Sequence, residues 1–288
     1  MKAIIQTTLN QAQLTDIQEP RFSSISIKIK TKYVPLLRYE LLKLDGSIPS
    51  KLPMIMGYGA TGIVTKVGAL RSNPLLNQRV LVLHPWGTFQ EEIVSDIPPL
   101  TIPIIDGVSF TEATALIGGV DLALTLFKLI KQKEKQVIIY GADSVTGLVL
   151  MQLLTQYGNL NFTPKVRSVS LDYLNEKTKE YNIKPTFKTH SSNNLVIDLV
   201  GSAINQQLFR HISQGDEVIS VAQKDTSGIH FISKPAFPKD YQFLMKAIKA
   251  KRLLISLNQI FSYQDFKAAI NFQKNTPSRG RNLISFEN

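Results

Sequence analysis

The apolar positions of this chain follow two different spacings, which predict a strand-rich first part and a later part in which strands and helices alternate. Ile25–Lys30 places isoleucine at every second position, which predicts a strand with one buried face. Val137–Tyr140 is a continuous apolar run, typical of a parallel strand covered on both faces. Four more strands are predicted at Lys165–Ser170, Leu195–Val200, Glu217–Val221 and Asn282–Phe286.

Helical spacing begins near Thr111. Val149, Leu153 and Tyr157 recur at the spacing of a helix, and Leu171–Tyr181 has the pattern of a charged amphipathic helix. Strands that alternate with helices in this way predict an α/β fold with a doubly wound parallel sheet. In the C-terminal region we expect a helix at Tyr241–Ile248, then a short strand at Leu253–Ser256, and then a second helix at Phe266–Ile270.

The length and composition indicate a globular protein. The 288 residues are 43% hydrophobic and 19% charged, and this length fits two domains. The chain has no cysteine, which excludes disulfides, thiol nucleophiles, iron–sulfur clusters and zinc sites built on thiolate. No apolar run approaches the ~18–20 residues of a membrane span, and the N-terminus lacks the pattern of a secretory signal. We therefore expect a soluble cytoplasmic protein with no membrane partner.

The net charge of +11 is concentrated near the C-terminus, where residues 234–288 carry 10 basic and 3 acidic side chains. A solvated basic surface explains this bias, but so does an anionic partner such as a phosphorylated cofactor or nucleic acid. Phe261, Tyr263 and Phe266 beside Lys267 resemble a platform for stacking nucleobases. Helical core spacing explains these aromatic residues better, so a nucleic-acid partner is not expected.

The turn after Val137–Tyr140 is the first candidate site. A strand that leads through a glycine turn into a helix presents free backbone N–H groups to a diphosphate. Ser144 and Val145 occupy the middle of this turn, and their β-carbons can block close approach of a phosphate. Asp143 would repel a phosphate unless it caps the helix. The predicted cofactor-binding residues of the turn are Gly141, Ala142, Asp143, Ser144, Val145, Thr146 and Gly147.

Six segments follow one another in an order that resembles a known family: Leu52–Gly68, Gly87–Val94, Val137–Ala142, Val196–Gly201, Ser213–Ser220 and Gly280–Phe286. Together they resemble the medium-chain dehydrogenase/reductase superfamily, and within it the zinc-free quinone oxidoreductase and enoyl reductase branch. The resemblance implies a GroES-like domain made from residues 1–107 and 236–288, with a Rossmann dinucleotide-binding domain at 108–235. It also implies a homodimer.

Two departures from the zinc-dependent relatives concern the catalytic centre. Their Gly-His-Glu motif reads Gly57-Tyr58-Gly59 here, and the position of their first cysteine ligand falls near Leu37. Neither leucine nor tyrosine suits Zn²⁺, so we expect no zinc. Tyr58 and Tyr39 are the candidate catalytic residues, because each hydroxyl is placed to hydrogen-bond a substrate carbonyl in the cleft. The alternative is that each tyrosine only packs its ring.

The choice between NADP and NAD is expected at the end of the second parallel strand. NADP-using relatives place serine or threonine there, often with a basic residue. Ser170 fits a phosphate, whereas Asp172 is suited to a free ribose 2′-hydroxyl, and Arg167 is a compensating cation. These three residues and Val221 complete the predicted cofactor site. NADP is favoured slightly over NAD.

Other polar residues carry no comparable pattern. Glu91 and Glu92 are expected to be structural, and four histidines without ligand-like spacing are expected to lie at the surface or to be hydrogen-bonded: His84, His190, His211 and His230.

Three functions follow from these observations. The leading hypothesis is a zinc-independent NAD(P)H-dependent reductase of a quinone, an enone or a similar activated double bond. The second is a degenerate relative that binds partners without catalysis, and an open or a collapsed glycine turn discriminates the two. The third is nucleic-acid binding through the basic C-terminal region.

Overall fold

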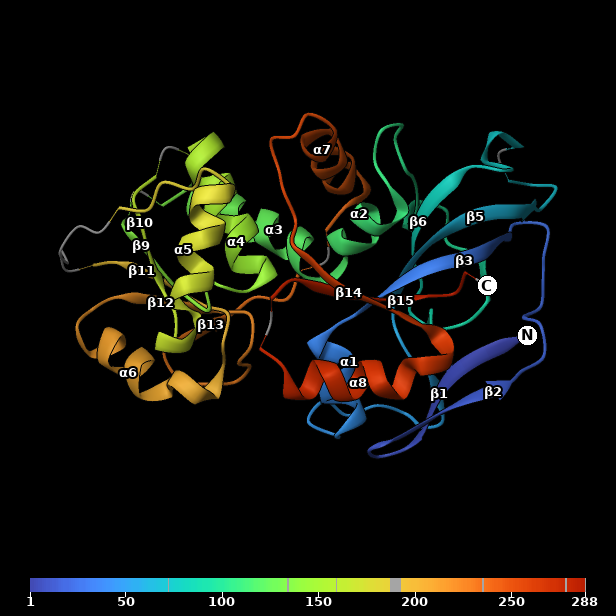
Figure 1. The fold of residues 1–288 in the computed structure, drawn as a ribbon, viewed down its shortest axis with the longest axis horizontal. Helices are drawn as coiled ribbons and strands as arrows, with labels where there is room; N and C mark the ends of the chain where they lie inside the picture. The colour runs from blue at the N-terminus through green and yellow to red at the C-terminus, as the bar shows by residue number, and fades with distance from the viewer. Residues whose placement is uncertain are drawn as a thin grey trace.

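The computed structural model has two lobes, one with a parallel sheet and the other with strands from both ends of the chain (Figure 1). The N- and C-termini both lie in the second lobe. The structure describes residues 1–71, 73–133, 135–158, 160–186, 193–234, 236–277 and 279–287.

The parallel sheet has the strand order β10-β9-β11-β12-β13, and every neighbouring pair in it is parallel. Since β9 is the first of these strands in the chain, the order reverses between β9 and β11. In open sheets of this kind the crevice at the carboxyl ends of the strands, at that reversal, is the usual ligand site. The strands are β9 (Val137–Tyr140), β10 (Phe162–Lys165), β11 (Leu195–Asp198), β12 (Glu217–Ser220) and β13 (Ile229–Phe231).

Helices cover both faces of this sheet, as the residues of β9 show. Alternate residues of this strand point to opposite faces, and each face packs against helices. Val137 and Ile139 pack into the large core that includes α3 (Asp121–Ile130) and α4 (Val145–Leu153). Ile138 packs into a separate cluster with Leu208 of α6. Covering both faces explains why β9 is apolar throughout. The remaining helices of this lobe are α5 (Leu171–Glu180) and α6 (Asn205–Ser213).

The other lobe is built on a sheet with the order β14-β15-β3-β5-β6-β8, to which β7 adds by pairing with β3. The last strand of the chain, β15, runs antiparallel to β3, which joins the two chain ends. The strands of this sheet are β3 (Ile27–Leu36), β5 (Gly59–Val67), β6 (Arg79–Leu83), β7 (Glu92–Ser95), β8 (Thr101–Pro103), β14 (Leu257–Ser262) and β15 (Arg281–Ser285).

A small sheet of order β2-β1-β4 and four further helices complete the described part of the molecule. The fold is thus α/β, with a parallel Rossmann-type sheet beside a β-rich part made from both chain ends. The predicted domain boundaries remain predictions, and residue 235 lies outside the described residues. The additional elements are β1 (Lys2–Thr8), β2 (Gln11–Asp16), β4 (Met54–Ile55), α1 (Arg38–Leu44), α2 (Phe110–Ala115), α7 (Pro238–Lys249) and α8 (Phe266–Asn275).

Contrary to the expectation from sequence, one segment is long and apolar enough for a membrane span. Phe110–Ile130 has a mean hydropathy of 1.7 over its most apolar stretch, but 72% of that stretch is buried inside the protein. Its backbone departs from helical geometry at Ile117, Gly118 and Gly119. A buried core helix meets the same length and composition test, so this segment is weak evidence for a membrane.

Two predicted strands are misplaced. The strand expected at Lys165–Ser170 ends at Lys165, and Ser168–Ser170 is a short 3-10 turn that leads into α5. Serines before a helix favour such turns, because their hydroxyls compete for backbone hydrogen bonds. The strand expected at Leu253–Ser256 instead occupies Leu257–Ser262, and it includes Phe261.

The aromatic residues considered as a stacking platform belong to the core. Tyr263 and Phe266 are buried, and the Tyr263 ring stacks on that of Phe286 with centroids 5.0 Å apart. Phe261 lies on a strand, so the helical spacing proposed for it is wrong although its packing role is right.

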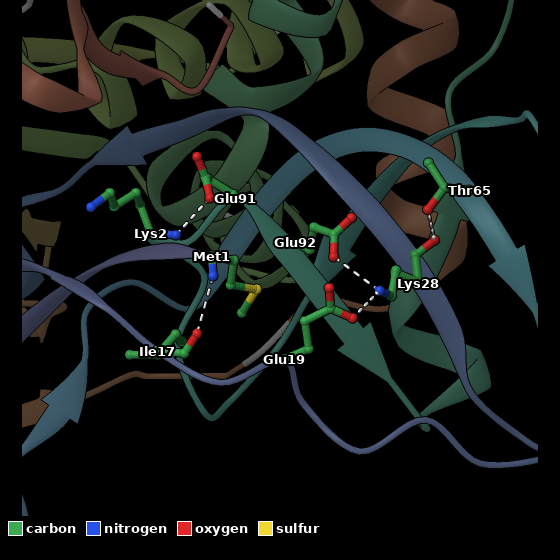
Figure 2. A network of polar contacts seen from close by, with 8 residues as sticks. All are labelled: Met1, Lys2, Ile17, Glu19, Lys28, Thr65, Glu91 and Glu92. Carbon is green, nitrogen blue, oxygen red and sulfur yellow. Dashed lines mark hydrogen bonds and ion pairs between the residues drawn. The ribbon is translucent and has the colours of Figure 1, made fainter.

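The two consecutive glutamates hold strands together near the N-terminus (Figure 2). Glu92 and Glu19 both pair with the Lys28 ammonium group, at 3.0 and 2.7 Å. The backbone N–H of Lys2 donates to Glu91 Oε2 at 2.5 Å. These contacts give both glutamates the structural role expected of them.

Candidate functional site

A cavity of about 760 Å³ opens at the carboxyl edge of the parallel sheet. Loops that follow four of its strands line one wall. Arg167 follows β10, Leu199 follows β11 and Val221 follows β12, while Ser144–Thr146 comes from the turn after β9. The cavity therefore lies at the reversal of strand order, where this sheet type binds its ligands.

The opposite wall comes from the other lobe, chiefly α1, α8 and the start of β15. Cationic side chains predominate around the cavity: Arg38, Arg167, Lys274 and Arg281 line it, against one carboxylate, Asp45. A cavity of this charge favours an anionic ligand.

The glycine turn is open toward the cavity. Ser144 caps α4, since its Oγ accepts from the Gly147 amide at 3.1 Å. The amides of Val145 and Thr146, which lie between Ser144 and Gly147, belong to the first turn of the helix and have no intrahelical partner. Both residues line the cavity. The β-carbons of Ser144 and Val145 therefore leave the turn accessible.

Gly147 packs closely against the turn itself. A β-carbon at this position would lie 2.7 Å from the Ala142 Cα, the Ala142 carbonyl oxygen and the Gly141 carbonyl oxygen. These are backbone atoms, which cannot move aside as a side chain does. Gly141 has a φ of +76°, which lets the chain turn sharply out of β9.

Asp143 does not cap the helix, which contradicts one of the two alternatives for this residue. Ser144 is the cap, and the Asp143 carboxylate instead lies 3.5 Å from the Arg279 guanidinium. Asp143 is absent from the cavity lining.

Arg281 is the most constrained cation at the cavity. It is 8% exposed, and its Nη2 donates to the Gly118 carbonyl oxygen at 3.2 Å. Its Nε is buried and has no hydrogen-bond partner among the described residues. Burial lowers the pKa of this guanidinium, and the carboxylates of Asp121 and Glu40 oppose that shift. Since Arg281 lines the cavity, its positive charge favours an anionic ligand there.

Two buried carboxyl groups, those of Asp121 and Glu40, act electrostatically on Arg281. Asp121 accepts from the Gly119 amide and from the Tyr241 hydroxyl, both at 2.7 Å, and so fixes the break between α2 and α3. Glu40 accepts from the Leu37 amide at 3.1 Å, and burial raises the pKa of Glu40 to about 7.

The two candidate catalytic tyrosines lie beside the cavity and are not part of its lining. Tyr58 is half-buried, and its hydroxyl lies next to Gly118, which lines the cavity. Burial and the nearby Asp121 carboxylate raise the pKa of Tyr58 well above its ordinary value, so the hydroxyl keeps its proton. Tyr39 is 40% exposed and meets the Tyr58 ring edge-on, with centroids 6.0 Å apart.

The predicted cofactor residues divide into two groups. Five line the cavity: Ser144, Val145, Thr146, Arg167 and Val221. The others lie outside its lining: Gly141, Ala142, Asp143, Gly147, Ser170 and Asp172. Ser170 is fully buried, and Asp172 is exposed in the first turn of α5.

The cations of the opposite wall, Arg38, Lys274 and Arg281, were not individually predicted from the sequence, because nothing in the local pattern links them to the turn. Asp198 at the end of β11 was not predicted either. The Asp198 carboxylate accepts from the amides of Val200 and Gly201 and from the Ser220 hydroxyl, at 2.7 to 2.9 Å. It thus holds the loops after β11 and β12 at the cavity.

The histidines are dispersed. His84 was expected to lie at the surface or to be hydrogen-bonded. It is instead buried, and its Nδ1 has no hydrogen-bond partner among the described residues. His211 is hydrogen-bonded to Asp216 and Tyr140, His230 is exposed on β13, and His190 lies outside the described residues. Within the described ranges no three residues of the types His, Cys, Asp and Glu form a group able to hold a metal ion.

No protein-family model matches the chain. Three curated proteins match parts of it. A trans-enoyl reductase of Aspergillus clavatus is 33% identical over 38% of this chain, and the mouse synaptic vesicle membrane protein VAT-1 homolog-like is 26% identical over 53%. The matches span 31% and 37% of those two proteins, so only about a third of each is covered.

Solved structures match the whole chain. The quinone oxidoreductase of Coxiella burnetii superposes with a TM-score of 0.84 over 100% of this chain and 99% of its own, at 20% identity. The chain therefore shares the fold of that enzyme, which confirms the predicted α/β fold with a parallel Rossmann-type sheet.

Proposed function

We propose that this protein is an NAD(P)H-dependent oxidoreductase whose dinucleotide binds in the cavity at the carboxyl edge of the parallel sheet. One observation carries the proposal: the first residues of α4, whose amides have no intrahelical partner, line the same cavity as Arg38, Arg167 and Arg281. Helix N-termini and arginine both favour a diphosphate, and the cavity brings them together. The open turn also favours a binding site over the degenerate alternative.

The residues that fit the diphosphate are Val145 and Thr146 through their amides and Arg281 and Arg38 through their guanidinium groups. When bound, a reduced nicotinamide supplies a hydride. Tyr58 keeps its proton because of the raised pKa of its hydroxyl, so it is suited to donate a hydrogen bond to a substrate carbonyl oxygen. Without a histidine or cysteine at positions 58 and 37, we propose a reaction independent of zinc.

For the substrate, we propose a quinone, an enone or a similar activated double bond. The names of the relatives, a trans-enoyl reductase and a quinone oxidoreductase, support this class. Such substrates need only a hydride at an electron-poor carbon and a proton from a weak acid or water. A homodimer in the cytoplasm remains part of this proposal.

The test is a titration of the full chain with NADPH and with NADH, followed by nicotinamide fluorescence. Binding at micromolar concentration and consumption of the reduced nicotinamide with a quinone or an enone are expected. If neither dinucleotide binds at millimolar concentration, the proposal is wrong. Chelator treatment should leave the activity unchanged, and a loss of activity would contradict zinc independence.

A further inference from the structure

A second arginine of the C-terminal segment, Arg279, reaches the parallel sheet beyond the end of β10. Its Nη1 lies 3.3 Å from Ser170 Oγ and 3.5 Å from Asp143 Oδ2, and its Nη2 donates to the Val169 carbonyl oxygen at 3.3 Å. The guanidinium carbon lies 4.7 Å from the centroid of the Tyr173 ring. One cation thus joins the glycine turn after β9 to the start of α5.

The backbone that follows Arg279 packs closely against Ser256. Gly280 has a φ of +132°, and a β-carbon there would lie 2.7 Å from the Ser256 carbonyl oxygen. The Arg281 amide donates to the same carbonyl at 2.7 Å, and the Tyr173 hydroxyl donates to Ser256 Oγ at 3.4 Å. Since Gly280 and Arg281 line the cavity, Arg279 is held beside it.

Arg279 lies where the adenosine ribose of a dinucleotide is expected, and the 2′-substituent of this ribose, a phosphate or a hydroxyl, distinguishes NADPH from NADH. In a sheet of this order the adenosine ribose lies near the carboxyl ends of the first two strands, here β9 and β10. Arg279 covers the Ser170 side chain, which is fully buried, and Arg167 lines the cavity nearby. Asp172, exposed in the first turn of α5, is the only acidic residue of that turn.

The ion pair between Arg279 and Asp143 is suited to exchange. Its atoms are 3.5 Å apart and both side chains are partly exposed, so solvent screens the attraction. A phosphate offers the guanidinium two parallel charge-assisted hydrogen bonds, which are shorter than the 3.5 Å contact with the Asp143 carboxylate.

We propose that Arg279 selects the phosphorylated dinucleotide by exchanging the Asp143 carboxylate for the 2′-phosphate of NADPH. NADH carries a hydroxyl at that position and leaves the ion pair in place. Asp143 is then an internal competitor of the phosphate. This inference rests on the proposed function and adds the choice of cofactor to it.

The test compares the dissociation constants of NADPH and NADH for the wild-type chain and for Arg279→Gln. The variant should weaken NADPH by about tenfold or more, as expected for a lost charge-assisted hydrogen bond, and change NADH less than about twofold. Arg210→Gln, an exposed change on α6 that removes the same charge, is the matched control and should change neither. Added salt should weaken NADPH more than NADH in the wild type only.

A second variant separates exchange from simple charge. Asp143→Ser should tighten NADPH severalfold with little change for NADH, and this gain should disappear in the double variant Arg279→Gln/Asp143→Ser. A stability measurement accompanies each variant, so that a folding defect is not read as a binding effect.

Three results would overturn the inference. They are equal wild-type affinity for NADPH and NADH, an equal loss of both in Arg279→Gln, and an Asp143→Ser gain that persists without Arg279. In each of them the wild type still binds a dinucleotide, so the proposed function stands. Only failure of both dinucleotides to bind the wild type would refute the proposed function as well.

Discussion

The guanidinium of Arg281 donates a 3.2 Å hydrogen bond to the carbonyl oxygen of Gly118, which joins the last strand of the chain to the break between α2 and α3. The two residues are 163 positions apart in the sequence. Both line the cavity, so this bond places a cation and a backbone break at the same wall. Four predictions follow from this site.

Arg281→Met should reduce both folding stability and dinucleotide binding. The change breaks the bond to Gly118 and removes the positive charge that acts on the buried Asp121 and Glu40 groups, at a cost of about 1–3 kcal/mol in the free energy of unfolding. Arg38→Met is the matched control, since Arg38 is exposed and lines the same cavity. It should weaken binding with less than about 0.5 kcal/mol of destabilisation. Urea denaturation and fluorescence titration measure the two effects.

Gly147→Ala should destabilise the protein by about 1–3 kcal/mol and weaken dinucleotide binding. Its β-carbon would lie 2.7 Å from backbone atoms of the turn, so the turn or the start of α4 must shift. Gly158→Ala is the control, because its nearest neighbours are side-chain atoms at 3.2 Å or more. Thermal denaturation of both variants tests the prediction, and equal melting temperatures would contradict it.

Glu40→Gln should change how stability depends on pH. The pKa of Glu40 rises from 4.5 in the unfolded chain to about 7 in the folded protein, because the carboxyl is buried. The folded state therefore binds this proton more tightly, and wild-type stability falls as pH rises from 4.5 to 7.

Glutamine keeps an acceptor for the Leu37 amide and has no proton to lose. Above pH 7 the Glu40→Gln variant should be more stable than the wild type by an amount on the order of 2–3 kcal/mol, and the advantage should vanish near pH 4.5. Free energies of unfolding measured across this range check the sign. A stability difference that does not vary with pH would show that folding leaves the pKa of Glu40 unchanged.

Tyr58→Phe should lower the turnover of an enone or a quinone by about ten- to a hundredfold while dinucleotide affinity stays unchanged. The phenyl ring preserves the packing, and only the hydroxyl beside Gly118 is lost. Tyr39→Phe should change turnover less than about twofold, because Tyr39 is largely a ring contact at the surface. Steady-state rates at saturating dinucleotide separate the two tyrosines, and equal effects would remove Tyr58 from the reaction.

Local features of the chain were predictable because their causes are local. The apolar run of Val137–Tyr140 forms a parallel strand since both of its faces are covered, and the alternation of strands and helices is the one expected. Gly147 is required by close packing within a single turn, which the strand–turn–helix pattern indicates. The order of the six segments was enough to predict the fold.

Other features depended on contacts between distant parts of the chain. The local sequence predicted that Asp143 either caps the helix or lies next to the phosphate. In the folded protein Ser144 is the cap, and Asp143 forms an ion pair with Arg279, which is distant in the sequence. The end of β10 was missed because Ser168–Ser170 alternates polar and apolar residues as a strand does, yet forms a turn before α5.

The sequence by itself determined that a strand, a glycine turn and a helix would form one wall of a site. Tertiary structure decided what faces that wall. Arg38 and Arg281 lie at opposite ends of the chain, and the antiparallel pairing of β15 with β3 brings those ends together. Such pairing depends on the packing of whole sheets, so no local spacing encodes which cations complete the cavity.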